Sequence, residues 1–272
     1  MSLRTSCRKA LASVPIVDAW FRRFVWSRIH YPEVEMRFIN ELAPGSVDVA
    51  IDVGAALGAY SWLMNRVSKT VVAFEPGSVH YKYLKRAVIA SRIEVVNAAL
   101  GTYTGLGLLM TPGFDETARH SATLSTQNPA AGTAMASATS VSVLSLDEFF
   151  SAQRFEERSI DLLKIDVEGY ELQVLEGAIN TLSTHHPLIV CEIEARHNPN
   201  YMEVFELLHS LGYFCYIFRD GAYRRFEIDT LEHIQGPEEL RMRLSPGYDA
   251  RVNSYTNNFV FQMLSSRIKV AP

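Results

Sequence analysis

Short apolar runs alternate with helical patterns along most of the chain. Continuous apolar runs predict strands that are buried on both faces, as in a parallel sheet. They occur at residues 47–53, 70–74, 93–96, 161–165, 188–193, 213–218 and 259–263. Between them, apolar positions three or four residues apart predict helices at residues 57–67, 78–90, 171–182 and 202–211. This alternation predicts an α/β fold with helices on both faces of the sheet.

A separate helical pattern precedes the first strand. Apolar residues recur at helical spacing over residues 16–42 and stop before Pro44 and Gly45. We expect a helical cap over residues 1–43 and one larger domain over residues 44–272. The tryptophans and arginines of this segment would also suit peripheral contact with a membrane surface. Packing against its own domain is the commoner role for such a helix.

One region interrupts the alternation. Residues 101–143 contain no convincing helix and are rich in Ala, Ser, Thr and Gly. Short strand patterns at 106–110, 122–124 and 140–144 predict an inserted β-hairpin or lid. A segment of this length inside a compact domain is usually functional, and we expect residues 111–140 to form a mobile cover.

The composition is that of a globular chain, since 48% of the 272 residues are hydrophobic and 21% are charged. The net charge of −4 offers no electrostatic footprint for nucleic acid. No apolar stretch is long enough to span a membrane, and Pro15 makes the N-terminal stretch a poor signal peptide. Cys7, Cys191 and Cys215 are too few for a disulfide framework. No Cys/His cluster has zinc spacing, so we expect no metal site. The few cysteines and the poor signal peptide lead us to expect a reducing, cytoplasmic location.

The first strand runs into a glycine-bearing turn. Gly54 and Gly58 bracket the start of the next helix, where a ligand can approach the backbone and the free N–H groups of a helix N-terminus. The spacing is Gly-x-x-x-Gly rather than the Gly-x-Gly-x-x-Gly of dinucleotide binders. Alone, such a turn occurs in many α/β proteins.

The second strand ends in Glu75, followed by Pro76. A carboxylate at this place can accept hydrogen bonds from both hydroxyls of an adenosine ribose, although a solvated glutamate is the alternative. A ribose carboxylate without a pyrophosphate fingerprint favours a nucleoside ligand that lacks a diphosphate. S-adenosylmethionine is the obvious candidate.

Further acids follow the fourth and fifth strands. Asp166 and Glu168 emerge after the fourth strand, and His197 follows the fifth in an acidic stretch, residues 192–197. Open α/β sheets bind their ligands at this carboxyl edge. Glu168 could instead stabilise the start of the next helix, and a histidine after a strand is more often polar surface.

Several segments resemble the FkbM-type family of class I S-adenosylmethionine-dependent methyltransferases. They are residues 51–60, 73–76, 145–149, 163–171, 174–178 and 258–261. The resemblance runs from about residue 44 to residue 264, and its most specific part is the Lys-Ile-Asp-Val-Glu-Gly run that starts at Lys164. The chain departs from the family at Ala56 and Leu57, where Asn and Ile are usual.

The resemblance implies a Rossmann-like class I methyltransferase domain at residues 44–272. Its mostly parallel, seven-stranded sheet would have the order 3-2-1-4-5-7-6, with the last strand antiparallel. It also implies S-adenosylmethionine as cofactor, with Glu75 on the ribose and residues 97–99 near the adenine. The expected cofactor-binding residues are Asp52, Gly54, Ala55, Gly58, Tyr60, Glu75, Pro76, Asn97, Ala98 and Asp166.

The expected reaction is methyl transfer to a hydroxyl of a sugar, glycolipid or natural product. A free alcohol is a poor nucleophile, so a base should remove its proton as the new bond forms. The candidates are Asp166, then Glu168, then His197, whose imidazole can exchange a proton near neutral pH. Two alternatives stay open: a nucleotide-dependent oxidoreductase on the same kind of sheet, and a catalytically silent binding module. The missing Gly-x-Gly-x-x-Gly motif counts against the first, and the retained acids count against the second.

Overall fold

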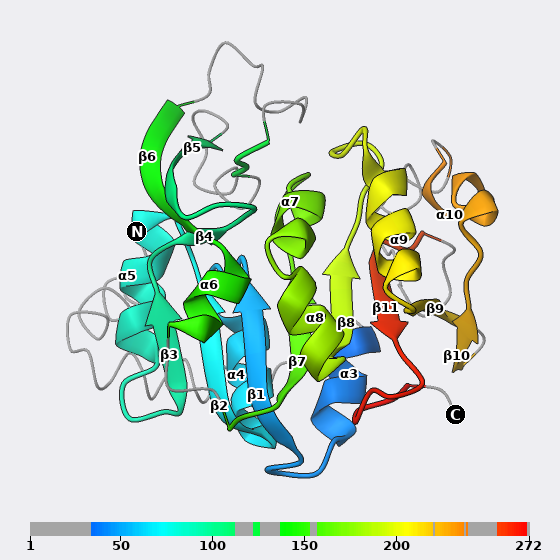
Figure 1. Ribbon diagram of the computed structural model, residues 1–272, viewed down its shortest axis with the longest axis horizontal. Helices are drawn as coiled ribbons and strands as arrows, with labels where there is room; N and C mark the ends of the chain where they lie inside the picture. The colour runs from blue at the N-terminus through cyan, green and yellow to red at the C-terminus, as the bar shows by residue number, and fades with distance from the viewer. Residues whose placement is uncertain are drawn as a thin grey trace, which may run out of the picture.

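The computed structural model describes residues 34–111, 122–125, 137–152, 157–219, 221–236, 238 and 255–270. In this part of the chain the main sheet contains eight strands. They are β1 (Val47–Val53), β2 (Ser68–Phe74), β3 (Ile93–Val96), β7 (Ile160–Ile165), β8 (Leu188–Glu192), β9 (Phe214–Arg219), β10 (Ala222–Arg225) and β11 (Asn258–Gln262). Across the sheet they lie in the order β10-β9-β11-β8-β7-β1-β2-β3 (Figure 1).

The strand order confirms the fold that the resemblance implies. Strands β3, β2, β1, β7 and β8 are parallel neighbours, and β11 lies antiparallel between β8 and β9. The expected count of seven strands is wrong, because β10 adds an eighth at the edge, antiparallel to β9. Residues 222–225 are mostly exposed and include two arginines, so this edge strand lacks the continuous apolar run of a buried strand.

Helices cover both faces of the sheet. One face carries α3 (Val34–Glu41), α4 (Ala59–Val67) and α5 (Ser78–Ala87), whose apolar side chains share one buried cluster with the sheet. The other face carries α6 (Leu146–Ser151), α7 (Glu171–Glu176), α8 (Ile179–His185) and α9 (Tyr201–Ser210), which share a second cluster. A short turn η3 (Ile228–Thr230) and helix α10 (Glu232–Gln235) follow β10.

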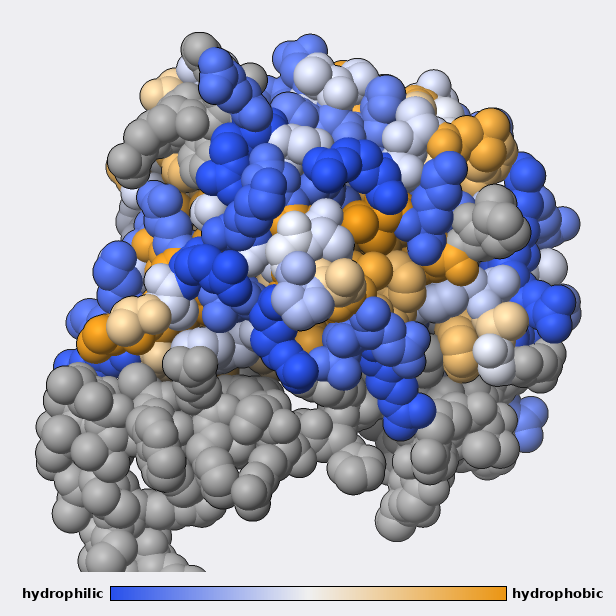
Figure 2. Space-filling view, turned by 90° about the horizontal axis from the view of Figure 1, so that it is seen from below, coloured by the Kyte–Doolittle hydropathy of each residue, from blue (hydrophilic) through white to orange (hydrophobic). Residues whose placement is uncertain are grey.

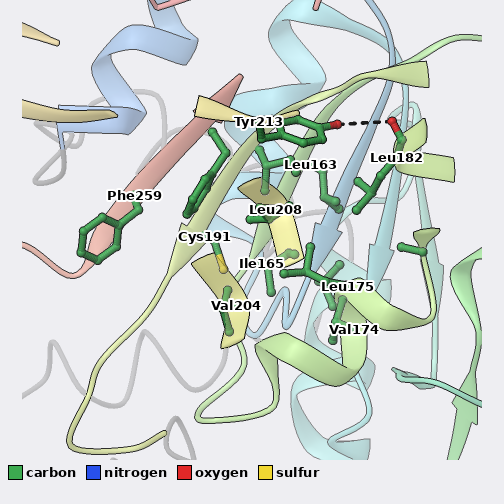
Figure 3. Close-up of a cluster of buried hydrophobic side chains, with 14 of the residues drawn as sticks. Leu163, Ile165, Val174, Leu175, Leu182, Cys191, Val204, Leu208, Tyr213 and Phe259 are labelled. Atoms are coloured by element: carbon green, nitrogen blue, oxygen red, sulfur yellow. Dashed lines mark hydrogen bonds between the residues drawn. The ribbon is translucent and has the colours of Figure 1, made fainter. Parts of the chain in front are cut away.

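Figure 3 shows the second cluster, in which the side chains of α7, α8 and α9 meet those of the sheet. The hydroxyl of Tyr213 donates to the carbonyl of Leu182 at 3.4 Å, so this buried tyrosine has a partner. Cys191 is buried and Cys215 is half-buried, and both are free thiols, as expected. Burial raises the pKa of the Cys191 thiol, which makes it unreactive. Cys7 lies outside the described residues.

The helix predicted at residues 171–182 is two helices, because the chain breaks at Gly177. A Cβ on Gly177 would lie 2.0 Å from the carbonyl oxygen of Gly101, so only glycine fits this close approach. The Asp147 carboxylate then accepts hydrogen bonds from the backbone N–H groups of Asn180 and Thr181, at 2.9 and 2.8 Å. It caps the start of α8 from α6, far away in the sequence.

The insertion forms the expected hairpin. Strands β5 (Gly105–Thr111) and β6 (Ser137–Leu144) pair antiparallel, and β4 (Ala99–Leu100) joins β6 to make a small three-stranded sheet. The hairpin extends past the carboxyl ends of β1 and β2 (Figure 1). The strand predicted at 122–124 is reduced to a single bridge between Thr123 and Met110. The rest of the predicted cover lies outside the described residues, so its mobility stays a prediction.

Of the helix predicted at 16–42, the structure describes α3. Its residues Met36 and Ile39 are buried and pack in the same cluster as β1 and α4. Residues 16–33, with the tryptophans and arginines considered for membrane contact, lie outside the described part. Among the described helices, none is long and apolar enough to cross a membrane.

The two edges of the sheet differ in chemistry. Seen from the amino ends of the parallel strands, polar and apolar residues are intermixed on the surface (Figure 2). At this edge Arg158 donates to Asp48 at 3.1 Å, and Arg267 donates to the buried Asp161 at 3.0 Å. These ion pairs join β1, β7 and the segment after β11, and they are structural. The acids that could do chemistry lie at the carboxyl edge.

Candidate active site

The turn between β1 and α4 packs tightly against the end of β7. Gly54 has φ +79°, and a Cβ there would lie 1.9 Å from the backbone oxygen of Asp166. The N–H groups of Gly54 and Ala55 both donate to the carbonyl of Phe74 at 3.0 Å. Gly58 has φ +88°, and its missing Cβ leaves room for Leu84 of α5. The turn is therefore held by β2, α5 and β7 together.

Glu75 closes this turn from the end of β2. Its carboxylate accepts from the N–H of Ala56 at 2.8 Å and from the N–H of Gly77 at 2.7 Å, one on each oxygen. Each oxygen keeps a further lone pair, so two more donors can bind. Burial raises the pKa of Glu75 to about 7, although both backbone hydrogen bonds favour the ionised form. The side-chain amide of Asn97 holds the following loop through the carbonyls of Glu75 and Pro76.

Asp52 lies beneath the turn and is 2% exposed. It accepts a hydrogen bond from the hydroxyl of Ser61, and burial raises its pKa to about 6. This carboxylate does not line the cavity between Glu75 and Asp166. The structure therefore places Asp52 where it supports the turn from inside the fold.

A fully buried lysine connects the end of β7 to the start of β11. Lys164 donates to Asn258 at 3.0 Å and to the carbonyl of Ile165 at 3.2 Å. Its Nζ lies 3.6 Å from the Asp166 carboxylate and 5.0 Å from the centre of the Tyr60 ring. A buried ammonium needs such partners. The Asp166 side chain is 39% exposed. Its carboxylate is therefore paired with Lys164 and also accessible from solvent.

A cavity separates Glu75 from Asp166 and is roofed by the insertion. Its wall is made by the turn, by Tyr170 and His80, and by four described residues of the insert. The lining residues are Val53, Gly54, Ala56, Phe74, Glu75, Pro76, His80, Ala99, Leu100, Leu109, Ala122, Thr123, Leu124, Asp166, Val167, Glu168 and Tyr170. A neighbouring groove shares Glu75, Pro76 and His80 and continues past Asn97 along β6. Of the expected cofactor residues, five line neither space: Asp52, Ala55, Gly58, Tyr60 and Ala98.

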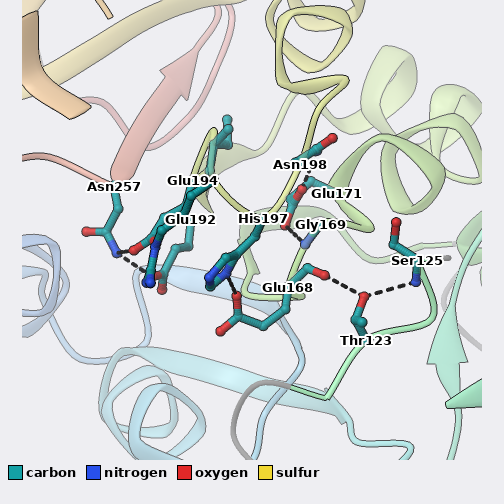
Figure 4. Close-up of polar contacts among 12 residues, drawn as sticks. Thr123, Ser125, Glu168, Gly169, Glu171, Glu192, Glu194, His197, Asn198 and Asn257 are labelled. Atoms are coloured by element: carbon teal, nitrogen blue, oxygen red, sulfur yellow. Dashed lines mark hydrogen bonds and ion pairs between the residues drawn. The ribbon is translucent and has the colours of Figure 1, made fainter. Parts of the chain in front are cut away.

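Glu168 and His197 form a hydrogen-bonded pair. The Glu168 carboxylate contacts Nδ1 of His197, although the two residues follow different strands (Figure 4). Both side chains are partly exposed, at 25% and 19%. The Thr123 hydroxyl donates to the backbone oxygen of Glu168 at 2.5 Å, and the N–H of Ser125 donates to that hydroxyl at 2.9 Å. The insertion is thus anchored directly on the pair.

Other polar side chains continue the same edge (Figure 4). The Asn257 amide donates to both Glu192 and Glu194, and Arg196 forms an ion pair with Glu194. The sequence pattern placed the glutamates here but gave no indication of Asn257, whose only signal is its position just before β11. Within the described residues, no group of three His, Cys, Asp or Glu side chains could hold a metal ion.

The strand order, the buried carboxylate after β2 and the acids after β7 together define the Rossmann-like fold of class I methyltransferases. The chain belongs to the FkbM methyltransferases: the methyltransferase FkbM domain matches residues 52–215. This match confirms the resemblance seen in the sequence. No curated protein matches the chain.

Three solved structures are similar to this chain at low sequence identity. The FkbM methyltransferase of Methylobacillus flagellatus KT is 15% identical over 87% of this chain, with a TM-score of 0.43, and this chain spans 47% of its length. Precorrin-6y C5,15-methyltransferase of Geobacter metallireducens GS-15 is 10% identical over 86% of this chain and 87% of its own, with a TM-score of 0.40. An S-adenosylmethionine-dependent O-methyltransferase of Thermotoga maritima is 14% identical over 89% of this chain and 68% of its own, with a TM-score of 0.39.

Proposed function

We propose that this protein is an S-adenosylmethionine-dependent O-methyltransferase that acts on a hydroxyl of a sugar, glycolipid or natural product. The observation that carries the proposal is the Glu168–His197 pair, which shares the carboxyl edge with the buried Glu75. The pair supplies a base, and Glu75 supplies a carboxylate for a ribose. Membership of the FkbM family supports methyl transfer.

The residues around Glu75 suit the nucleoside part of the cofactor. Two lone pairs of the Glu75 carboxylate remain beyond the bonds from Ala56 and Gly77, which matches the two hydroxyls of a ribose. The groove that continues past Asn97 has room for the adenine. When bound, the cofactor supplies an electrophilic methyl group on a sulfonium, and Asp166 at the cavity wall would stabilise that positive charge.

His197 is the base that the geometry favours. A carboxylate only accepts hydrogen bonds, so Glu168 holds the proton on Nδ1 of His197 and leaves Nε2 to take one from the acceptor hydroxyl. Asp166 is the alternative base, but its carboxylate is already paired with the Lys164 ammonium, 3.6 Å away. Alignment of the acceptor oxygen with the methyl group is then a task of orientation.

A hydroxyl-rich acceptor fits the polar edge beside the pair. Glu192, Glu194 and Asn257 present carboxylates and an amide, and such arrays orient sugar hydroxyls, whereas a flat aromatic acceptor calls for a mostly apolar slot. The net charge of −4 disfavours a nucleic acid. Arg241, Arg243 and Arg251 would suit a phosphate on the acceptor, and all three lie outside the described residues.

The test is methyl transfer from radiolabelled S-adenosylmethionine to a panel of glycans, glycolipids, phenols, RNA and proteins. We expect labelling of at least one hydroxylated carbohydrate or natural product, and tight binding of S-adenosylmethionine by calorimetry. Labelling of only RNA, protein or a simple phenol would overturn the acceptor class. Absence of S-adenosylmethionine binding would overturn the proposed activity as a whole.

A further inference from the structure

The side chain of Glu171 lies behind the Glu168–His197 pair and makes no contact with the cavity. It is the first residue of α7 and is 3% exposed. Its Oε1 accepts from the backbone N–H of Gly169 at 2.8 Å, and its Oε2 accepts from the side-chain amide of Asn198 at 2.7 Å. One carboxyl group therefore bridges two loops that are otherwise far apart in the chain.

The two residues that Glu171 binds, Gly169 and Asn198, directly follow the two members of the pair (Figure 4). Gly169 follows Glu168, and its φ of +81° belongs to the left-handed region that glycine tolerates best. Asn198 follows His197 and is 4% exposed, and its Oδ1 accepts from the N–H of Asn200 at 2.9 Å. The bridge thus fixes the backbone immediately beside each member of the pair.

The loop after β8 is rigid on its other side as well. The N–H groups of His197 and Asn198 both donate to the carbonyl of Glu194, at 2.9 and 3.1 Å. These two hydrogen bonds hold residues 194–198 together as one unit. The Glu171–Asn198 bond ties this unit to the start of α7, three residues after Glu168.

We propose that Glu171 is a positioning residue, which holds the two loops in register so that Glu168 stays bonded to Nδ1 of His197 and Nε2 stays unprotonated. The use of Nε2 as a base rests on the proposed methyl transfer to a hydroxyl. The geometric role of Glu171 does not depend on that reaction. Its loss should move the pair apart, and a misplacement of about 1 Å can cost about a hundredfold in rate.

The first test needs no acceptor. Protein with 15N-labelled histidine is studied by NMR, and the ring signals of His197 are those that vanish in His197→Gln among the eight histidines. In the wild type we expect neutral His197 to carry its proton on Nδ1. In Glu171→Ala we expect the proton to move largely to Nε2, with the binding of S-adenosylmethionine changed by less than about threefold.

A reversed pair separates positioning from mere filling of space. In Glu171→Gln the one oxygen that remains accepts from the N–H of Gly169, so the new NH2 group faces the NH2 group of Asn198. Asn198 cannot turn its oxygen toward it without losing the bond from Asn200, so the bridge breaks. In Glu171→Gln/Asn198→Asp the new amide donates to the new carboxylate, and the Nδ1 tautomer should return. Glu176→Ala, at the exposed end of the same helix, is the matched control and should leave the His197 signals unchanged.

With the acceptor from the labelling screen, kcat should fall about 10- to 100-fold in Glu171→Gln and recover in the double variant. A folded Glu171→Ala or Glu171→Gln protein whose His197 keeps the wild-type tautomer would overturn the positioning role. So would a double variant that folds but does not recover. A wild type that fails to bind S-adenosylmethionine would remove the proposed function instead, and the tautomer result would stand.

Discussion

Glu75 carries two opposing influences in one side chain. Burial raises its pKa to about 7, while the N–H groups of Ala56 and Gly77 favour its charge. Ribose hydroxyls bind the ionised form better, because a carboxylate offers more acceptor sites. We therefore expect the affinity for S-adenosylmethionine to rise about tenfold from pH 6 to pH 8, measured by calorimetry at constant ionic strength.

The control for this prediction is a side chain that cannot ionise. Glu75→Gln should bind about 10- to 100-fold more weakly at pH 8, since charged hydrogen bonds contribute about 1.5–3 kcal/mol, and it should lose most of the pH dependence. Glu75→Ala should bind as weakly while the fold stays intact. An affinity of the wild type that is flat across this range contradicts the role given to Glu75.

Two substitutions distinguish the candidate bases. His197→Gln should lower kcat by about 10²–10⁴ with the chosen acceptor, because proton removal is lost. Asp166→Asn should lower kcat by about tenfold, since it removes only a stabilising charge near the sulfonium, and neither change should abolish cofactor binding. If Asp166→Asn is the more damaging of the two, the base role belongs to Asp166.

At the scale of an element, the turn between β1 and α4 depends on the space left by Gly54. Gly54→Ala would strain a φ of +79° and drive a Cβ into the backbone oxygen of Asp166. We expect a loss of about 2–5 kcal/mol in the free energy of unfolding and a loss of cofactor binding. Urea denaturation and calorimetry measure the two effects.

Gly45 provides the matched comparison. Its φ is +76°, but nothing lies within 4 Å of the place that a Cβ would take, so Gly45→Ala carries the backbone strain alone, about 1–2 kcal/mol. Its cofactor binding should be unchanged. Equal losses of stability in the two variants would show that the contact between the turn and β7 contributes nothing.

The elements that sequence reasoning found and missed differ in what encodes them. The central strands are continuous apolar runs, so their positions and order follow from pattern and resemblance. The break at Gly177 depends on the carbonyl of Gly101, which is a tertiary contact that no local pattern contains. The bridge from Glu171 to Asn198 and the pairing of Glu168 with His197 likewise need the fold, although the residue types had marked both strand ends.

At the scale of the whole molecule, three buried carboxyl groups bias stability in one direction. Burial raises the pKa of Asp52 to about 6, of Glu75 to about 7 and of Glu171 to about 8. The folded protein therefore binds more protons than the unfolded chain from about pH 4 to pH 8, and its free energy of unfolding falls as the pH rises. His185, whose pKa burial lowers, acts in the opposite sense.

Between pH 5.5 and pH 8, without cofactor, we expect the free energy of unfolding to fall by about a few kcal/mol. The Tm should therefore fall by roughly several degrees. Scanning calorimetry measures it, and Glu171→Gln should flatten the upper part of the curve. A Tm that rises over this range contradicts the burial of these carboxyl groups. In stronger acid Asp48 reverses this trend, because its pKa is lowered in the folded protein and its protonation destabilises the fold. Burial raises the pKa of Asp48, but the hydrogen bonds from Arg158 and Ser159 outweigh burial.

The place of β11 has a consequence for how the chain is made. The ribosome delivers β9 and β10 before β11, yet β11 lies between β8 and β9. The β9–β10 hairpin therefore leaves the ribosome before β11, the strand that joins it to β8 in the described sheet. Until β11 is made, the hairpin cannot take its place in the sheet. Asn258, the partner of the buried Lys164 ammonium, arrives with that same strand. Long-range pairings of this kind are slow to form. A nascent chain paused before residue 258 would therefore expose an open sheet edge and lack the hydrogen bond from Lys164 to Asn258. Intermediates with exposed sheet edges are the kind that chaperones bind.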